Sequence, residues 1–186
     1  MALTATIHHL RITLSDVDRA VYEHLDLRVA RHPSESGRYL VTRTLAYCLS
    51  YEDGIAFSKG GLSAADEPPI AVRDPTGILL AWIDVGAPSA ERLHKASKAA
   101  QRVSLYTHVD PTLLRREASS RVVHKLADIE VTRVEPSFLD ALEAKIGRNT
   151  DLEIVRTDGR LYVTIDGGVV EAELTRVSLT EVGAGA

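Results

Sequence analysis

The stretch Ile78-Leu79-Leu80-Ala81-Trp82-Ile83-Asp84-Val85-Gly86 decides the fold prediction, because it is an apolar run that ends on a carboxylate. An uninterrupted apolar run of this length predicts a strand that is buried on both faces. A charge at the end of such a strand requires a hydrogen-bonded, cationic or metal partner. Asp84 is therefore the first candidate functional residue.

The segments on either side of this strand alternate between helix and strand. From Ser34 the apolar residues recur with helical spacing, and Asp53-Gly54 predicts the end of that helix. Short strands are expected at 55–58 and 70–73, a helix from Pro88, and a strand at 103–107. The predicted core at 34–108 thus has the order helix, strand, strand, strand, helix, strand.

Two further units flank this core. Alternating residues predict a hairpin of strands at 3–14 and 25–29, with a bulge at His8-His9 where the alternation slips by one residue. Helices are expected at about 111–125 and 136–146, and an extended segment at 129–134. The C-terminal part predicts a meander at 152–156, 161–165 and 170–174, because Asp-Gly pairs separate alternating runs.

Composition predicts one soluble domain. The 186 residues are 45% hydrophobic, which suffices for one core, so we expect a single domain over 1–182 and a frayed tail at 183–186. The first residues lack the basic n-region and apolar h-region typical of a signal peptide, and no apolar run approaches the roughly 20 residues that cross a bilayer. These features predict a cytoplasmic protein with no membrane contact. The net charge of −4 means that any nucleic-acid contact must be local to one face.

A pair of acids is the main candidate site. If Asp74-Pro75-Thr76-Gly77 is a four-residue connection, Arg73 lies opposite Ile78 and Glu67 lies opposite Asp84. Two like charges opposed in this way destabilise a sheet unless a positive species lies between them. Mg²⁺ or Mn²⁺, held by Glu67, Asp84 and neighbouring oxygens, would be such a species.

The helix from Pro88 offers a cation as well. Glu91, Lys95, Lys98 and Arg102 share one face, which would lie near the end of the strand. A carboxylate pair beside an ammonium is suited to phosphodiester hydrolysis, in which a metal activates water and a lysine stabilises the developing charge. Lys98 or Lys95 would take that role.

Each residue of the proposed site also has an explanation in which it plays only a structural role. Lys95 and Lys98 are compatible with a solvated helix face paired with Glu91. Asp66 is suited to capping a turn, and Asp84 to a partnership with a lysine or with backbone amides and no metal. A helix N-terminus alone accounts for Glu35.

Several segments resemble a known family. Ala30-Arg31-His32-Pro33-Ser34-Glu35, Asp66-Glu67-Pro68 and Trp82-Ile83-Asp84-Val85-Gly86-Ala87-Pro88 are similar to motifs of the YaeQ family of bacterial proteins. The order of elements also resembles the PD-(D/E)XK restriction-endonuclease core. The implied fold is α/β (α+β), a nuclease-like core with an N-terminal β-hairpin and a C-terminal β-meander.

The resemblance implies roles for single residues. Glu67 or Asp66 matches the first acid of the nuclease pattern, Asp84 the second, and Glu35 the acid that some relatives place on the first helix. Two residues after Asp84, where the pattern has lysine, this chain has Gly86. A substitute lysine at Lys95 or Lys98 is one interpretation, and loss of catalysis is the other.

Two functional hypotheses follow. The first is a Mg²⁺-dependent nuclease with Glu67, Asp84, Asp66 and Glu35 as metal ligands and Lys98 or Lys95 assisting. The second is a non-catalytic regulatory module that binds nucleic acid or a protein on the same fold. No zinc-ligand spacing among the seven histidines and no P-loop or Gly-x-Gly-x-x-Gly motif is found, so we expect no nucleotide or organic cofactor.

Overall fold

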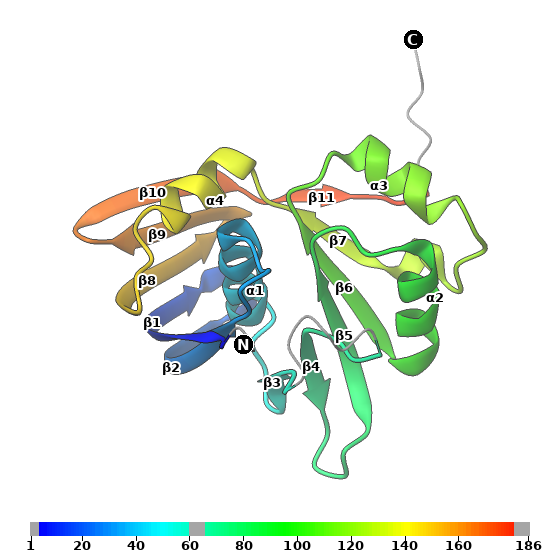
Figure 1. The fold of residues 1–186 in the computed structure, drawn as a ribbon, viewed down its shortest axis with the longest axis horizontal. Coiled ribbons are helices and arrows are strands. Elements are labelled where there is room, and N and C mark those ends of the chain that lie inside the picture. The colour runs from blue at the N-terminus through cyan, green and yellow to red at the C-terminus, as the bar shows by residue number, and fades with distance from the viewer. Residues whose placement is uncertain (1–3, 60–65, 181–186) are drawn as a thin grey trace.

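Two mixed β-sheets face each other across helix α1 in the computed structural model of the chain (Figure 1). The structure describes residues 4–59 and 66–180. The first sheet has the strand order β10-β9-β8-β1-β2, and the second has the order β11-β7-β6-β5-β4-β3. The mixed α/β class predicted from the sequence is therefore confirmed.

The first sheet joins the two ends of the chain. Its strands are β1 (Thr6–Asp16), β2 (Val21–Arg31), β8 (Asn149–Thr157), β9 (Arg160–Ile165) and β10 (Gly168–Glu173). The predicted N-terminal hairpin and C-terminal meander both exist. They form one sheet because β1 pairs in parallel with β8, a contact that no local pattern signals.

The predicted bulge at His8-His9 is wrong. β1 pairs with β2 without interruption from Thr6 to Asp16. His8 takes the inward position in the alternation and is buried, while Ile7 faces outward and is 53% exposed. A polar side chain at an inward position produced the apparent slip, and the His8 ring hydrogen-bonds to the Gly147 carbonyl at 2.8 Å.

The second sheet contains the predicted core. Its strands are β3 (Ile55–Phe57), β4 (Ile70–Arg73), β5 (Leu79–Val85), β6 (Arg102–Thr107), β7 (Glu130–Arg133) and β11 (Thr175–Val177). β5, β6 and β7 are parallel, and β3, β4 and β11 are antiparallel to their neighbours. Strand β11 brings the C-terminal segment back to this sheet.

Four α-helices complete the part of the chain that the structure describes: α1 (Gly37–Leu49), α2 (Ala90–Ala99), α3 (Pro111–Ala118) and α4 (Pro136–Glu143). Ser36 and Ser89 cap α1 and α2, because each serine oxygen accepts the amide hydrogen three residues later. Helix α3 ends at Ala118, seven residues before the predicted end. The η3 turn (Leu126–Asp128) follows instead.

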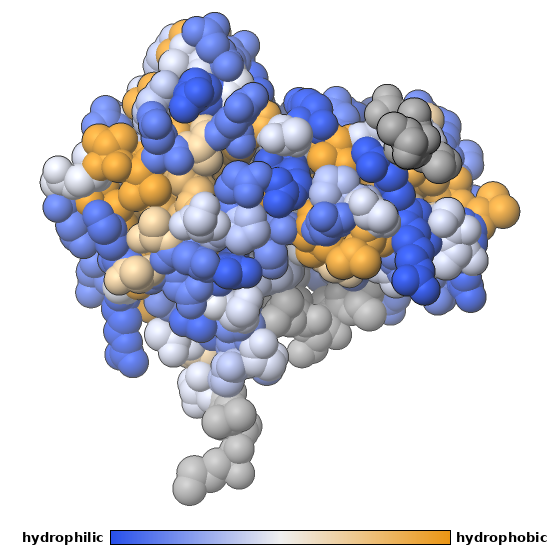
Figure 2. Space-filling view, turned by 90° about the horizontal axis from the view of Figure 1, so that it is seen from above, coloured by the Kyte–Doolittle hydropathy of each residue, from blue (hydrophilic) through white to orange (hydrophobic). Residues whose placement is uncertain are grey.

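Helices cover both faces of the second sheet. One core unites both sheets with α1 and α4, and a separate core lies between the second sheet and the pair α2 and α3. Figure 2 shows the molecule from above, with hydrophilic residues over most of that face and hydrophobic residues in separate patches. Trp82 belongs to the core shared with α2 and α3, so the buried face of β5 that holds Trp82 and Asp84 points toward α2.

Candidate functional site

Asp84 lies at the end of β5 with a partner for each carboxylate oxygen. Its Oδ1 accepts from the Val85 amide at 3.0 Å. Its Oδ2 accepts from the Trp82 indole at 3.0 Å and from the Arg92 Nε at 2.6 Å. Asp84 is 2% exposed. The prediction that this buried carboxylate needs a positive or hydrogen-bonding partner is confirmed, and the partner is an arginine.

Arg92 is the functional-site residue that sequence reasoning missed. It lies in the first turn of α2, where the Ser89 cap holds its backbone amide. Its guanidinium lies 5.4 Å from the centre of the Trp82 ring and donates from Nη2 to the Glu67 carbonyl at 3.0 Å. Arg92 therefore ties the end of β5 to α2 and to the segment before β4. The Ser89 cap was the signal that places Arg92, rather than Lys95, beside the strand end.

The predicted opposition of Glu67 and Asp84 is wrong. The observed register differs from the predicted one: Ile70 pairs with Ile83, and the register shifts by one residue between Val72 and Arg73. Strand β4 begins only at Ile70, because Pro68 and Pro69 have no amide hydrogen to give to a ladder. Glu67 precedes the strand and is exposed, so its side chain has no place in the sheet opposite Asp84.

Neither candidate lysine is the partner of Asp84. Lys95 forms an ion pair with Asp66 at the surface. The hydrogen bond and positive charge of Lys95 hold the pKa of Asp66 below its ordinary value. Lys98 is exposed and makes no ion pair with any residue in 4–59 or 66–180. The assignment of Lys95 and Lys98 to catalysis stays a prediction.

Glu35 lies in a second buried ion pair. Its carboxylate accepts from Arg43 at 2.8 Å and from the His32 amide at 3.1 Å. Arg43 also donates to the Ala30 carbonyl at 2.6 Å and lies over the rings of Tyr39 and Phe57. The helix-terminus explanation for Glu35 is thus too simple, since α1 supplies an arginine from its second turn.

Tyr39 is electrostatically coupled to both acid–arginine pairs. Burial raises the pKa of Tyr39 to about 12. The charge of Arg43 lowers this pKa, those of Asp84 and Glu35 raise it, and that of Arg92 lowers it again. The phenol therefore stays protonated at neutral pH.

Gly86 has a backbone reason to be glycine. Its φ is +87°, in the left-handed region that disfavours other residues, and its amide donates to the Tyr106 carbonyl at 2.9 Å. The space around it would admit a Cβ, since the nearest atom is a Tyr39 carbon at 3.7 Å. A lysine at this position, where the nuclease pattern has one, would carry backbone strain of about 1 to 3 kcal/mol.

Three of the candidate acids have separate cationic partners: Asp84 pairs with Arg92, Glu35 with Arg43 and Asp66 with Lys95. Within the described ranges, no group of three or more His, Cys, Asp or Glu residues is arranged to hold a metal ion. The Arg92 guanidinium already pairs with Oδ2 of Asp84. Binding of a metal by Asp84 would require this ion pair to separate.

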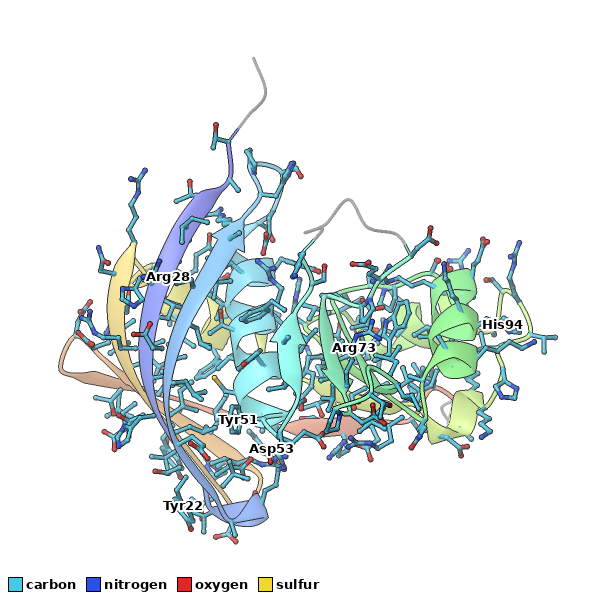
Figure 3. The ribbon with its side chains drawn as sticks, turned by 90° about the horizontal axis from the view of Figure 1, so that it is seen from below. Tyr22, Arg28, Tyr51, Asp53, Arg73 and His94 are labelled. Carbon is cyan, nitrogen blue, oxygen red and sulfur yellow. The ribbon has the colours of Figure 1, made fainter. Side chains whose placement is uncertain are left out.

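A second candidate surface is a basic layer, which we define as residues 91–125 on the outer side of the second sheet. This segment has eight Lys and Arg against three Asp and Glu, whereas the rest of the chain has 14 against 23. One of the eight, Arg102 on β6, faces the other side of the sheet, so seven cations belong to the layer. The Nδ1 of His94 on α2 accepts from the His124 backbone amide at 3.2 Å and lies 3.1 Å from the Val122 carbonyl oxygen, which holds α2 beside the loop that follows α3. Figure 3 labels His94 on α2, with the second sheet between it and α1.

Three cations of the basic layer lack an anionic partner. Lys98, Arg116 and Lys125 are exposed, and none of them forms an ion pair with the residues that the structure describes. Arg121 pairs with Glu91 at 3.3 Å, and both of these side chains are more than half exposed. The layer therefore presents positive charge that is available to an external anion.

Among the helices at 4–59 and 66–180, none is both long and apolar enough to cross a membrane.

Comparisons with other proteins cover nearly the whole chain. The family model described as "YaeQ protein" matches residues 1–174. "Uncharacterized protein YaeQ" of Escherichia coli (strain K12) is 32% identical over 178 residues, covering 94% of this chain and 97% of that protein. The Salmonella typhi protein of the same name is 30% identical with the same coverage.

Solved structures agree with these matches. The crystal structure of YaeQ protein from Pseudomonas syringae has a TM-score of 0.84 at 29% identity, covering 92% of this chain and 95% of that one. The YaeQ protein from Xanthomonas axonopodis pv. citri also gives 0.84, at 30% identity, covering 93% and 98%. On the family match and the sequence identities together, the chain belongs to the YaeQ family.

Proposed function

We propose that this chain is a non-catalytic nucleic-acid-binding module built on a PD-(D/E)XK-like core, and that the basic layer contacts the phosphate backbone. The observation that carries the proposal is the Asp84–Arg92 ion pair. This ion pair occupies the carboxylate that hydrolysis would require. It also fixes the first turn of α2, the first helix of the basic layer.

The order of elements supports the nuclease-like core. Helix α1, strands β3, β4 and β5, helix α2 and strand β6 follow one another from Gly37 to Thr107. In this core Asp84 lies at the end of the third strand, where the nuclease pattern has its second acid. Arg92 and Gly86 then occupy positions at which catalysis would need a metal and a lysine, respectively.

The charge distribution supports nucleic acid as the ligand. The surplus of positive charge in the basic layer contrasts with the net charge of −4 of the whole chain. A local basic surface on an acidic protein attracts a polyanion to one face. Contacts of this kind bind phosphates without reading the base sequence.

Fluorescence anisotropy with labelled duplex DNA and single-stranded RNA, measured over a range of salt concentrations, tests the proposal. Replacement of Lys98, Arg116 and Lys125 by glutamine should weaken binding. The slope of log K against log salt should fall by about 0.7 to 0.9 for each phosphate that the variant no longer neutralises. The matched control replaces three exposed cations at the first sheet, Arg28, Lys145 and Arg148, by glutamine. Equally weakened binding in both variants, or no binding by the native protein, would overturn the proposal.

The nuclease is the second candidate, and the order of elements favours it. Incubation of the native protein with Mg²⁺ or Mn²⁺ and with DNA or RNA would reveal metal-dependent cleavage. If cleavage occurs and disappears in a folded Asp84→Asn variant, Asp84 is catalytic and the non-catalytic proposal is wrong. Binding without cleavage supports the proposal.

A further inference from the structure

The opposite face of the second sheet borders a cavity that neither hypothesis uses. The cavity has a volume of about 170 Å³ and lies between the two sheets, beyond the C-terminal end of α1. Figure 3 labels Tyr51 and Asp53, which follow α1 and lie next in sequence to the lining residues Ser50 and Glu52. We call this cavity the arginine cleft, after Arg19, Arg102, Arg156 and Arg176 in its lining.

Four segments far apart in sequence bring these arginines together. Arg19 comes from the turn between β1 and β2, Arg102 from β6, Arg156 from β8 and Arg176 from β11. The lining also contains Glu52 and Glu130, so four guanidinium groups face two carboxylates. Asp16 and Asp18, which pair with Arg19 and Arg156 from outside the lining, bring the carboxylates to four. The charges therefore balance, and an anionic ligand must replace a glutamate as the partner of an arginine.

Two of the arginines are held in place by the protein. Arg19 donates to the carbonyls of Leu49 and Tyr51, both at 2.8 Å, at the end of α1. Arg156 pairs with Asp18 at 3.1 Å and with the fully buried Asp16 at 3.4 Å. These contacts fix two guanidinium groups at the side of the first sheet before any ligand binds, with their charges balanced by Asp16 and Asp18.

The other two arginines can exchange partners. Arg102 pairs with Glu52 at 2.9 Å and Arg176 with Glu130 at 3.2 Å. Both arginine side chains are more than half exposed, at 58% and 63%. Exposed ion pairs of this kind contribute little stability, so a dianion could replace a glutamate as the partner at low cost.

Hydroxyl groups line the floor of the cleft. The Tyr106 hydroxyl lies 3.0 Å from the Ser50 hydroxyl, and Ser104 also lines the cavity. Burial raises the pKa of Tyr106, while Ser50 and the charges of Arg176, Arg156 and Arg19 lower it. Three of the guanidinium groups therefore act on the same buried hydroxyl.

We infer that the arginine cleft binds a phosphate group, free or at the end of a small phosphate monoester. Guanidinium groups match the geometry of phosphate oxygens, and hydroxyls complete their hydrogen bonding. The volume sets the size of the ligand, because sites for drug-sized molecules measure about 300 to 1,000 Å³. The cleft is large enough for one phosphate group and too small for a strand of nucleic acid, which the basic layer would bind on the other side of the sheet.

Isothermal titration calorimetry on the full chain tests this inference, with inorganic phosphate and glycerol 3-phosphate as separate probes in chloride buffer of constant ionic strength. Saturable binding of either probe supports the inference, and a preference between them identifies the free or the esterified group. No saturable binding of either probe overturns it.

Variants locate the binding. Arg176→Gln and Tyr106→Phe should each weaken phosphate binding about tenfold, the effect of removing one charge-assisted or buried hydrogen bond. The matched control is Arg160→Gln, a surface arginine that pairs with Glu171 outside the cleft. Thermal unfolding without phosphate shows whether each variant is folded. Folded variants at positions 176 and 106 that bind as tightly as the control would overturn the inference.

Discussion

The two buried acid–arginine pairs have the same construction and differ in how far they are sealed from water. Glu35 and Asp84 each precede a serine-capped helix, and the arginine partner of each comes from that helix eight residues later. Arg43 and Glu35 are 6% and 1% exposed at their side chains. The side chain of Arg92 is 21% exposed, although that of Asp84 is only 3% exposed.

The difference in exposure makes Glu35–Arg43 a purely structural pair, whereas Asp84–Arg92 is accessible to solvent and ligands through Arg92. The Glu35–Arg43 pair is closed off beneath Tyr39 and Phe57, so it can only join β2 to α1. The Asp84–Arg92 pair reaches the surface beside Asp66 and Lys95 and supports the basic layer. A buried carboxylate at a strand end is therefore weak evidence for catalysis until its cation is known.

Breaking the sealed pair should have the largest effect. Arg43→Met leaves the Glu35 carboxylate buried without its cation, so the free energy of unfolding should fall by about 3 to 5 kcal/mol. Urea unfolding followed by circular dichroism measures this decrease. The double variant Glu35→Gln, Arg43→Met should recover part of it. If the single variant is as stable as the native protein, the Glu35–Arg43 pair is not shielded from water.

Breaking the partly exposed Asp84–Arg92 pair should lower the free energy of unfolding by less. Arg92→Met leaves Asp84 unpaired, but water can reach the position of the guanidinium, so we expect the free energy of unfolding to fall by about 2 to 3 kcal/mol. The same urea experiment applies. Addition of Asp84→Asn should restore stability. A decrease larger than that of Arg43→Met would reverse the comparison.

The raised pKa of Tyr39, which the charges of both pairs also affect, predicts a pH dependence of stability. Its pKa of about 12 exceeds the value near 10 of an unfolded chain, so the folded state keeps a proton that the unfolded state releases. The resulting stabilisation is complete below about pH 10 and is lost as the pH rises to about 12. Tyr39→Phe should reduce the fall in stability over this interval.

Unfolding free energies from pH 9 to 12, together with the absorbance of tyrosinate, measure this effect. The other tyrosines titrate in both proteins, and the difference between the two curves isolates Tyr39. Identical curves would show that burial does not raise the pKa of Tyr39.

The exposed pair should show the smallest effect. Lys95→Met removes the partner of Asp66, but both groups reach solvent, which screens their attraction. The midpoint of urea unfolding should stay within experimental error of the native value. A destabilisation comparable to that of Arg92→Met would show that Lys95 supports the Asp84 site.

Local patterns predicted the elements well. The apolar run at β5, a helix before and a helix after it, and the Asp-Gly turns appear as expected, because each depends on neighbours in sequence. The two helices begin at Gly37 and Ala90, after the predicted starts at Ser34 and Pro88. Helix α3 was predicted too long, since the residues after Ala118 pack as a loop against α2 through His94. Residues 60–65 and the predicted tail at 183–186 lie outside the described residues.

Pairings across space were harder to predict. The register between β4 and β5 depends on two prolines and a shift near Arg73, and one wrong turn length placed Glu67 opposite Asp84. The need for a cation at Asp84 could be inferred from burial, whereas its identity depended on the exact start of α2. The roles of Glu67, Asp66, Lys95 and Lys98 in catalysis, and the cytoplasmic location, stay predictions.

The parallel pairing of β1 with β8 sets the order in which the molecule can assemble. Arg11 and Asp151 are neighbours in the sheet although 140 residues separate them. During synthesis the N-terminal hairpin leaves the ribosome long before β8 exists, so one edge of β1 must wait without its partner. Closure of a loop of this length slows folding. The late strands β8, β9 and β10 thus complete the sheet that β1 and β2 begin, and the nascent hairpin exposes an unpaired edge until they arrive.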